Sequence, residues 1–404
     1  MRILIATTYR GPWGGAEKYL QSVIPSLVQR GHSVALLYES PIDPAAHVID
    51  EEAGEIPAWC SQELGVPATM QSIAAWKPDV VYSHGLDDFH LEGALLDAHP
   101  VVLFAHTYYG TCISGRKCFS SPRLEPCTRR FGAGCLAVYY PRRCGGVNPR
   151  TMLQLFQLQS KRRSNLPRYQ TVLVASRHMR HEMSENGVPV DRLRQIALPT
   201  PSTDSAGMVD RPTPGSRLLF VGRLMDVKGA SELLRAIPLA AEKLGRSLTV
   251  TIAGDGPQRS EVESLARRLR LSVNFAGWVN SEQRSQLMQE ADLLAVPSLW
   301  PEPFGLVGIE AGCFGLPAVG FAVGGIPDWL IPGVSGELAP GDPPSVEGLA
   351  EAIWRALRDP DHYQRLRKGA WETAGTFSLE RHLSQLEEIL GATTAARHLV
   401  PTSA

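Results

Sequence analysis

The sequence predicts an α/β protein with two doubly wound, parallel-sheet domains. Short apolar runs alternate with amphipathic helical patterns along the chain, which is the rhythm of repeated β-α-β units. The rhythm lapses into Pro, Ser, Thr and Gly at 198–217 and then restarts, as expected of a linker. With 404 residues, of which 44% are apolar, each half can bury a core of its own. We therefore expect a first domain at 1–200, a second at 201–376, and a C-terminal helical segment at 377–404.

The individual elements follow from the same pattern. Before the linker, apolar runs typical of buried strands lie at 2–7, 32–38, 79–85, 101–107 and 171–176, and helical patterns lie at 15–30, 68–76 and 151–164. After the linker, strands are predicted at 217–224, 247–256, 271–279, 292–298 and 316–321. A last helix at 378–391 has Leu379, Leu383, Leu386 and Leu390 on one face. This face must pack against another part of the molecule.

Composition excludes several classes of protein. The formal net charge of -1 disfavours a nucleic-acid partner. No apolar run reaches the roughly 18 residues that a membrane-spanning helix needs. A cytoplasmic location is the default expectation.

Cysteines are concentrated in one segment. Five of the seven fall within 33 residues, in a predicted insertion at 110–147. None of the spacings is the C-x-x-C pair that is typical of zinc sites. Two interpretations remain: a loop-rich insertion with free thiols or facultative disulfides, or a structural metal such as zinc. The candidate ligands are Cys112, Cys118, Cys127, Cys135 and Cys144.

Ligands of doubly wound sheets bind beyond the carboxyl ends of the strands, so the residues that follow each strand matter most. After the first strand, Gly14 and Gly15 precede a helical pattern. Backbone amides at such a helix start can hold an anion, although a tight turn would also explain the glycines. The spacing differs from the G-x-G-x-x-G fingerprint of dinucleotide-binding proteins.

Two further strand ends carry charged or titratable groups. In the second domain, Gly222, Arg223 and Lys228 follow a strand, and two cations beside a helix start favour a phosphate site. A solvated basic pair is the alternative. In the first domain, His106 ends the strand at 101–107, where it is either a catalytic group or a structural histidine.

The stretch WPEPFGLVGIEAG at 300–312 contains two glutamates eight positions apart. Pro303 disfavours helical geometry at Glu302, so we place Glu302 in a loop and the helix start near Phe304 or Gly305. Glu310 then lies about one and a half turns inside the helix. The amides of Phe304, Gly305 and Leu306 are expected to be free for an anion or hydroxyls. The alternative is a helix cap followed by an exposed surface glutamate.

These residues carry a resemblance to a known family. The combination of Gly14-Gly15, His106, GRLMDVKG at 222–229, AGDGP at 253–257, FAGWV at 275–279, Glu302-x7-Glu310 and VGGIPD at 323–328 resembles the retaining glycosyltransferases of family 4. The likeness covers nearly the whole chain, and the relatives meant are those with a Cys-rich insertion in the N-terminal domain. It implies the GT-B fold, in which two Rossmann-like domains face a central cleft.

The resemblance also implies roles for individual residues. Arg223 and Lys228 would neutralise the donor diphosphate, so that catalysis needs no metal cofactor. Glu302 would contact hydroxyls of the transferred sugar, Glu310 would bind the ribose, and His106 would lie near the anomeric centre. The remaining donor contacts would come from the backbone, at Gly14, Gly15, Gly222, Gly277, Trp278, Phe304, Gly305 and Leu306. Asp328 departs from the glutamate found in many relatives, and the last helix would cross back to the N-terminal domain.

The expected activity is transfer of a sugar from a nucleotide-diphosphate sugar, with UDP-sugars favoured, to an acceptor hydroxyl with retention of configuration. The acceptor would be a sugar or lipid-linked glycan of bacterial surface polysaccharide or glycoconjugate biosynthesis. A nucleotide-sugar 2-epimerase on the same fold and a catalytically silent nucleotide-sugar-binding protein are the alternatives.

One charge asymmetry bears on the acceptor independently. Residues 126–181 contain no Asp or Glu but many Arg and Lys residues. A basic surface of this kind fits peripheral contact with an anionic membrane, at the inner face of the cell membrane, or binding of a lipid-pyrophosphate acceptor. A solvated basic face is the alternative.

Overall fold

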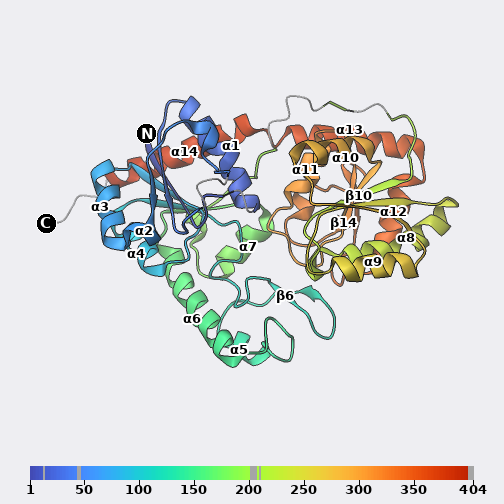
Figure 1. Ribbon diagram of the computed structural model, residues 1–404, viewed down its shortest axis with the longest axis horizontal. Coiled ribbons are helices and arrows are strands. Elements are labelled where there is room, and N and C mark those ends of the chain that lie inside the picture. Colours follow the sequence, from blue (N-terminus) through green and yellow to red (C-terminus); the bar gives the residue numbers. More distant parts are fainter. Residues whose placement is uncertain (12–13, 43–46, 201–206, 209–210, 399–404) are drawn as a thin grey trace.

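The computed structural model describes residues 1–11, 14–42, 47–200, 207–208 and 211–398. Pro12 and Trp13 beside the predicted glycine turn, residues 201–206 and 209–210 of the predicted linker, and the end of the chain at 399–404 lie outside the described residues. Figure 1 shows two α/β domains side by side, each built around a sheet with helices on both faces. The predicted fold class is confirmed.

The N-terminal domain contains a parallel sheet of seven strands in the order β3-β2-β1-β4-β5-β8-β9. Its strands are β1 (Arg2–Thr7), β2 (Ser33–Tyr38), β3 (Ala58–Cys60), β4 (Val80–Ser83), β5 (Val101–Phe104), β8 (Thr171–Val174) and β9 (Leu193–Gln195). Its helices are α1 (Gly15–Gln29), α2 (Ser61–Leu64), α3 (Val66–Trp76), α4 (Phe89–Ala98) and α7 (Arg177–Glu185). The chain order reverses between β1 and β4, so the adjacent strand ends open a crevice there.

An insertion between β5 and β8 leaves the sheet and extends below it in Figure 1. It consists of a short antiparallel hairpin, β6 (Cys118–Phe119) and β7 (Glu125–Pro126), followed by α5 (Gly134–Val138) and α6 (Pro149–Asn165). A small apolar core of its own, which includes Phe119, Phe131 and Tyr139, stabilises it.

The C-terminal domain contains a parallel sheet of six strands in the order β12-β11-β10-β13-β14-β15. Its strands are β10 (Arg217–Val221), β11 (Thr249–Ala253), β12 (Ser272–Gly277), β13 (Leu293–Val296), β14 (Ala318–Phe321) and β15 (Gly336–Ala339). Its helices are α8 (Ala230–Leu244), α9 (Arg259–Arg268), α10 (Ser281–Glu290), α11 (Leu306–Gly312), α12 (Val346–Leu357) and α13 (Pro360–Gly375).

All ten predicted strands are present. Besides the two-residue strands β6 and β7 of the insertion, the sequence analysis missed three strands of the parallel sheets: β3, β9 and β15. Each has only three or four residues and lies at an edge of its sheet. An edge strand has a single neighbour, so it does not need the long apolar run that marks a central strand.

The last helix, α14 (Leu379–His398), runs from the C-terminal domain back across the N-terminal domain (Figure 1). Leu383, Leu386 and Leu390 are buried. Glu387 accepts hydrogen bonds from Arg30 at 2.6 Å and pairs with His32 at 2.8 Å, just beyond α1. The apolar face of α14 therefore joins the two halves of the molecule.

Candidate active site between the two domains

The loop after β10 carries the predicted cations. A short 3₁₀ turn at Asp226–Lys228 ends at Gly229, whose φ is 72°. A Cβ at Gly229 would lie 1.9 Å from the carbonyl oxygen of Pro297, so only glycine fits here. The turn directs the Lys228 ammonium toward the Glu302 carboxylate, where Nζ donates to Oε1 at 2.6 Å.

Glu302 lies in a loop, as predicted, and its side chain is buried. Its Oε1 also accepts a hydrogen bond from the Ser298 hydroxyl at 2.6 Å. Burial raises the pKa of Glu302, but the charge of Lys228 and the hydrogen bonds from Lys228 and Ser298 outweigh it and hold that pKa below its usual value. The Glu302 carboxyl is therefore ionised at neutral pH.

Helix α11 begins at Leu306, and Gly305 before it is left-handed with a φ of 91°. The backbone amides of Phe304, Gly305 and Leu306 have no hydrogen-bond acceptor among the described residues. They lie directly after Glu302, at the helix start where an anion or hydroxyl oxygens bind well.

The two glycines of the VGGIPD motif, Gly324 and Gly325, pack directly against the backbone of the Glu302 loop. The Gly325 amide donates to the Glu302 carbonyl at 2.6 Å. A Cβ at Gly324, where φ is 57°, would lie 2.3 Å from the same carbonyl oxygen. The Trp329 indole donates to the Phe304 carbonyl at 2.8 Å. These contacts hold the two motifs against each other in the structure.

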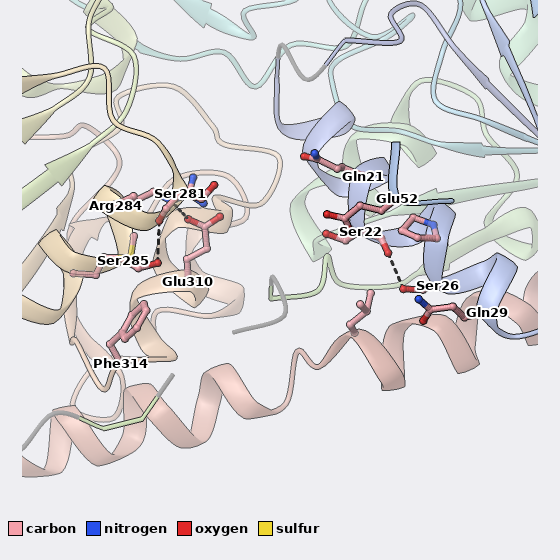
Figure 2. A pocket seen from close by; sticks show the side chains of 13 residues that line it. Gln21, Ser22, Ser26, Gln29, Glu52, Ser281, Arg284, Ser285, Glu310 and Phe314 are labelled. Carbon is pink, nitrogen blue, oxygen red and sulfur yellow. Dashed lines mark hydrogen bonds and ion pairs between the residues drawn. The ribbon is translucent and has the colours of Figure 1, made fainter. Parts of the chain in front are cut away.

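Glu310 lies deeper in α11, and its carboxylate pairs with Nε of Arg284 at 3.3 Å. Both side chains line a cavity of about 770 Å³ between the two domains. Figure 2 shows Glu310, Arg284 and Ser285 on one wall and side chains of α1 on the other. Helix α1 contributes Gln21, Ser22, Ser26 and Gln29 to this wall, and the 3₁₀ turn Glu51–Ala53 contributes Glu52. Glu310 therefore faces the space between the domains rather than bulk solvent.

The remaining predicted donor contacts lie at neighbouring strand ends. The Gly222 amide donates to the Ala253 carbonyl at 3.0 Å, and the Gly277 carbonyl accepts from Gly254 at 2.7 Å. The Trp278 side chain is 77% exposed. The side chain of Arg223 is exposed and makes no hydrogen bond or ion pair with the described residues. Arg223 thus shares a loop with Lys228 but does not join the Lys228–Glu302 pair in this structure.

On the N-terminal side, α1 begins at Gly15 with Gly14 as its N-cap, at the end of β1. His106 follows β5 and is partly buried, and its ring stacks on Phe104 at 4.4 Å. Its Nε2 is 2.8 Å from Nδ1 of His84, which follows the adjacent strand β4. Burial and the charge of His382 lower the pKa of His106 to about 3, so the imidazole is neutral.

His84 was missed by the sequence analysis. The available signal was its place at the end of the predicted strand at 79–85, next to the strand that ends at His106. Behind the pair, Tyr19 of α1 is hydrogen-bonded to Tyr82 at 2.6 Å and to His382 of α14 at 2.8 Å. Nothing in the local sequence indicated these contacts, because their members are up to 363 positions apart.

The two domains also touch beside the Glu302 loop. The Tyr108 hydroxyl donates to the Pro301 carbonyl, and the Ser176 hydroxyl donates to the Pro303 carbonyl at 2.6 Å. Asp328 accepts from the backbone amide of Arg177 at 2.8 Å and from its guanidinium at 2.9 Å. Asp328, the predicted departure from the family pattern, is therefore an interdomain contact.

The cysteines of the insertion are free thiols. Burial raises the pKa of Cys118 to about 12 and that of Cys144 to about 11. Among the residues that the structure describes, no three or more His, Cys, Asp or Glu side chains are grouped so that they could hold a metal ion. The free-thiol interpretation fits this arrangement, and a structural metal stays a prediction.

The basic segment is partly neutralised by acids from outside it. Four of its arginines form ion pairs, namely Arg142 with Glu125, Arg162 with Asp87, Arg168 with Asp97 and Arg177 with Asp328. The remaining charge is concentrated on exposed residues without an ion pair in the described part of the chain: Arg129, Arg130, Arg143, Arg150, Lys161 and Arg180. None of the described helices is long and apolar enough to span a membrane.

Comparison with known proteins supports this arrangement. A family model described as Glycosyltransferase Family 4 matches residues 13–199, and one described as Glycosyl transferases group 1 matches residues 209–373. The chain is 27% identical to a glycogen synthase of Mycobacterium tuberculosis, over 95% of each chain. It is 35% identical to a D-inositol 3-phosphate glycosyltransferase of Salinispora arenicola, over 46% of this chain and 43% of the relative.

Among solved structures, Anabaena Alr3699/HepE in complex with UDP-glucose aligns with a TM-score of 0.68 at 21% identity, over 97% of this chain and all of that one. Sucrose-phosphate synthase from Thermosynechococcus elongatus aligns with a TM-score of 0.70 at 22% identity, over 98% of this chain and all of that one. These likenesses establish the fold. Since the models match residues 13–199 and 209–373, the chain consists of a Glycosyltransferase Family 4 domain followed by a Glycosyl transferases group 1 domain, arranged in the fold of the GT-B glycosyltransferases.

Proposed function

We propose that the protein is a retaining hexosyltransferase that moves a sugar from a nucleotide-diphosphate sugar to an acceptor hydroxyl without a metal cofactor. The observation that carries the proposal is the pair of partly buried Lys228 and buried Glu302 near the start of α11, beside three backbone amides that have no acceptor among the described residues. Cation, carboxylate and amides match the diphosphate and the hydroxyls of such a donor.

In this proposal Lys228 and Arg223 stabilise the negative charge that develops on the leaving diphosphate. A divalent metal is then not needed for that role. Glu302 is not the nucleophile, because its carboxylate is held by Lys228 and Ser298. It binds hydroxyls of the transferred sugar, while the acceptor attacks the anomeric carbon from the side of the leaving group, which takes the acceptor's proton.

The nucleotide would lie along the carboxyl ends of the C-terminal strands. Glu310 would bind the ribose, the backbone at Gly277 and Trp278 the base, and the amides of Phe304, Gly305 and Leu306 the sugar or phosphate. Gly14 and Gly15 at the start of α1, together with His106, would close the site from the other domain. UDP-sugars are favoured as donors, in line with the UDP and UDP-glucose complexes of the HepE structure.

On the acceptor side we propose a sugar or lipid-linked glycan of bacterial surface polysaccharide or glycoconjugate biosynthesis. The protein would act in the cytoplasm, with its insertion against the inner face of the cell membrane. Exposed Tyr140, Val147 and Leu153 lie in the same segment as the unpaired arginines, a combination that suits an anionic bilayer. Binding to phosphatidylglycerol vesicles should then weaken steeply between low and physiological salt, and binding that ignores salt would contradict this part.

The decisive experiment is a screen of nucleotide sugars. The protein is incubated with each donor, with and without EDTA, while released nucleoside diphosphate is measured. Transfer or slow hydrolysis releases nucleoside diphosphate, and NMR of the anomeric proton shows whether configuration is retained. A 2-epimerase would alter the donor pool, and a silent binding protein would leave it intact, so either result would overturn the proposal.

A further inference from the structure

Two adjacent residues of the insertion have side chains that attach to different domains. Lys117 is 2% exposed, and its ammonium donates to the Glu182 carboxylate of α7 and to the Arg129 carbonyl. These bonds fix the hairpin of the insertion on the N-terminal domain. The side chain of Arg116, the residue before Lys117, extends instead toward the C-terminal domain.

The Arg116 guanidinium binds the carboxylate of Asp226, which lies in the loop after β10. One guanidinium nitrogen donates to Oδ1 at 2.7 Å and to Oδ2 at 2.6 Å. The side chains are only 34% and 40% exposed, so water screens this pair less than a fully exposed one. Among the described residues we find no other hydrogen bond or ion pair from the N-terminal domain to residues 222–229.

Asp226 is tied to the geometry of that loop. Its Oδ1 also accepts from the Val227 amide at 2.9 Å, so the carboxylate holds the start of the 3₁₀ turn that ends at Lys228. Lys228 is held at the other end by Glu302. The loop with both predicted phosphate-binding cations is therefore fixed between the insertion and the Glu302 loop.

We propose that Arg116 is a positioning residue that acts through Asp226: it holds the loop of Arg223 and Lys228 in the geometry that meets the donor diphosphate. The insertion thereby couples the acceptor domain to the donor site. This inference rests on the proposed role of Arg223 and Lys228. Its physical basis is that positioning charged donors before the reaction lowers the barrier more than the strength of the pair alone suggests.

The test compares Arg116→Gln with Arg142→Gln. Arg142 belongs to the same insertion but pairs with Glu125 inside it, so its loss reports on the stability of the insertion alone. We expect kcat for donor turnover to fall roughly five- to tenfold in Arg116→Gln, as is typical of coupling between sites, and to stay unchanged in Arg142→Gln. Acceptor KM should change little in both, and Arg116→Lys should recover part of the lost kcat.

A double-mutant cycle shows whether the effect passes through Asp226. If it does, Arg116→Gln combined with Asp226→Asn lowers kcat no further than Arg116→Gln alone. Additive losses would overturn the inference, as would a kcat of Arg116→Gln equal to that of Arg142→Gln.

Lys228→Ala separates failure of this inference from failure of the proposed function. Full turnover of Lys228→Ala would reject the assigned donor site. An inactive Lys228→Ala together with unaltered kcat in Arg116→Gln would reject only the positioning role. Calorimetric titration with UDP adds a second measurement, in which Arg116→Gln should weaken binding less than Lys228→Ala does.

Discussion

The carboxyl ends of the strands in the two domains face each other across the cleft, and the two sets are constructed in different ways. We call the loops at the strand ends of the C-terminal domain the C-terminal edge, and those of the N-terminal domain the N-terminal edge. The C-terminal edge depends on close contact between backbone segments, and glycines make that contact feasible. The N-terminal edge depends on side chains, chiefly aromatic rings and histidines from separate elements. The difference shows that close packing between backbone segments can be recognised in the sequence as short glycine motifs. Contacts between side chains that are far apart in the sequence leave no such motif.

The C-terminal edge shows the first principle. A Cβ at Gly254 would lie 1.9 Å from the carbonyl oxygen of Gly222, and one at Gly256 would lie 2.4 Å from that of Leu224. Together with Gly229 and Gly324, these positions hold four loops against one another. These glycines lie in the short motifs GRLMDVKG, AGDGP and VGGIPD, because a side chain at any of these positions would overlap a neighbouring loop.

The N-terminal edge shows the second. A carbonyl can only accept, so Nδ1 of His382 must donate to Ala197 at 2.8 Å. Burial lowers the pKa of His382 to about 4, so the ring is neutral and its Nε2 accepts from the Tyr19 hydroxyl. The Tyr19 oxygen in turn accepts from Tyr82. The hydrogen bonds therefore form one chain in which each group donates to the next: Tyr82 of β4 donates to Tyr19 of α1, which donates to His382 of α14.

The largest effect should come from the C-terminal edge. Lys228→Ala removes the cation and leaves Glu302 buried without its counter-charge, so we expect donor turnover to fall on the order of 10²- to 10³-fold. Steady-state release of nucleoside diphosphate measures it. Lys243→Ala is the control, because Lys243 pairs with Glu351 on the surface of the same domain. Equal turnover in the two variants would place the phosphate site elsewhere.

A pair of glycine variants tests the backbone principle itself. Gly324 and Gly333 both have positive φ, at 57° and 73°, but a Cβ at Gly333 meets no atom within 4 Å. Alanine at either site costs about 1–2 kcal/mol of backbone strain. Gly324→Ala should cost about 1–3 kcal/mol more, because its Cβ overlaps the Glu302 backbone. Denaturant unfolding measures the free energies, and equal losses would show that close packing is not what selects Gly324.

The buried histidines of the N-terminal edge should make the free energy of unfolding depend on pH. Burial lowers the pKa values of His84, His106 and His382 below the ordinary value of about 6.5. The unfolded chain then binds more protons than the folded one below that pH. Stability should be fully present above about pH 6.5 and be lost as the pH falls toward 4, by at most about 1.4 kcal/mol per pH unit for each histidine.

Melting temperatures between pH 7.5 and 5 measure this loss. His382→Gln should make the dependence on pH shallower, because one buried histidine no longer titrates. His47→Gln is the matched control, since the His47 side chain is 84% exposed. If both variants keep the slope of the parent protein, the ring cluster does not control acid stability.

The smallest effect should come from the contact between the two edges at Asp328. The guanidinium of Arg177 is 72% exposed, so Arg177→Ala should cost less than about 1 kcal/mol. Asp328→Ala should cost more, because it also removes the acceptor of the Arg177 backbone amide. Thermal unfolding compares the two variants, and equal losses would mean that the guanidinium, not the amide bond, holds the junction.

Much of the fold could be predicted because central strands need long apolar runs, and nine of the ten predicted strands are central; the tenth, β12, lies at an edge of its sheet. The loop position of Glu302 was predicted from Pro303, whose ring restricts the residue before it. The three short edge strands β3, β9 and β15 were missed. They form because they hydrogen-bond to one neighbouring strand, and their own residues do not show a long apolar run.

The sequence by itself determined the two parallel sheets, the places where their strands end, and the motifs that need glycine or proline backbone geometry. Tertiary structure alone decided that Lys228 meets Glu302, that His106 meets His84, and that Arg116 of the insertion reaches Asp226 across the cleft. The reason is physical. Backbone geometry is set by a residue and its nearest neighbours in the chain, whereas the partner of a charged or titratable side chain is set by how distant segments pack.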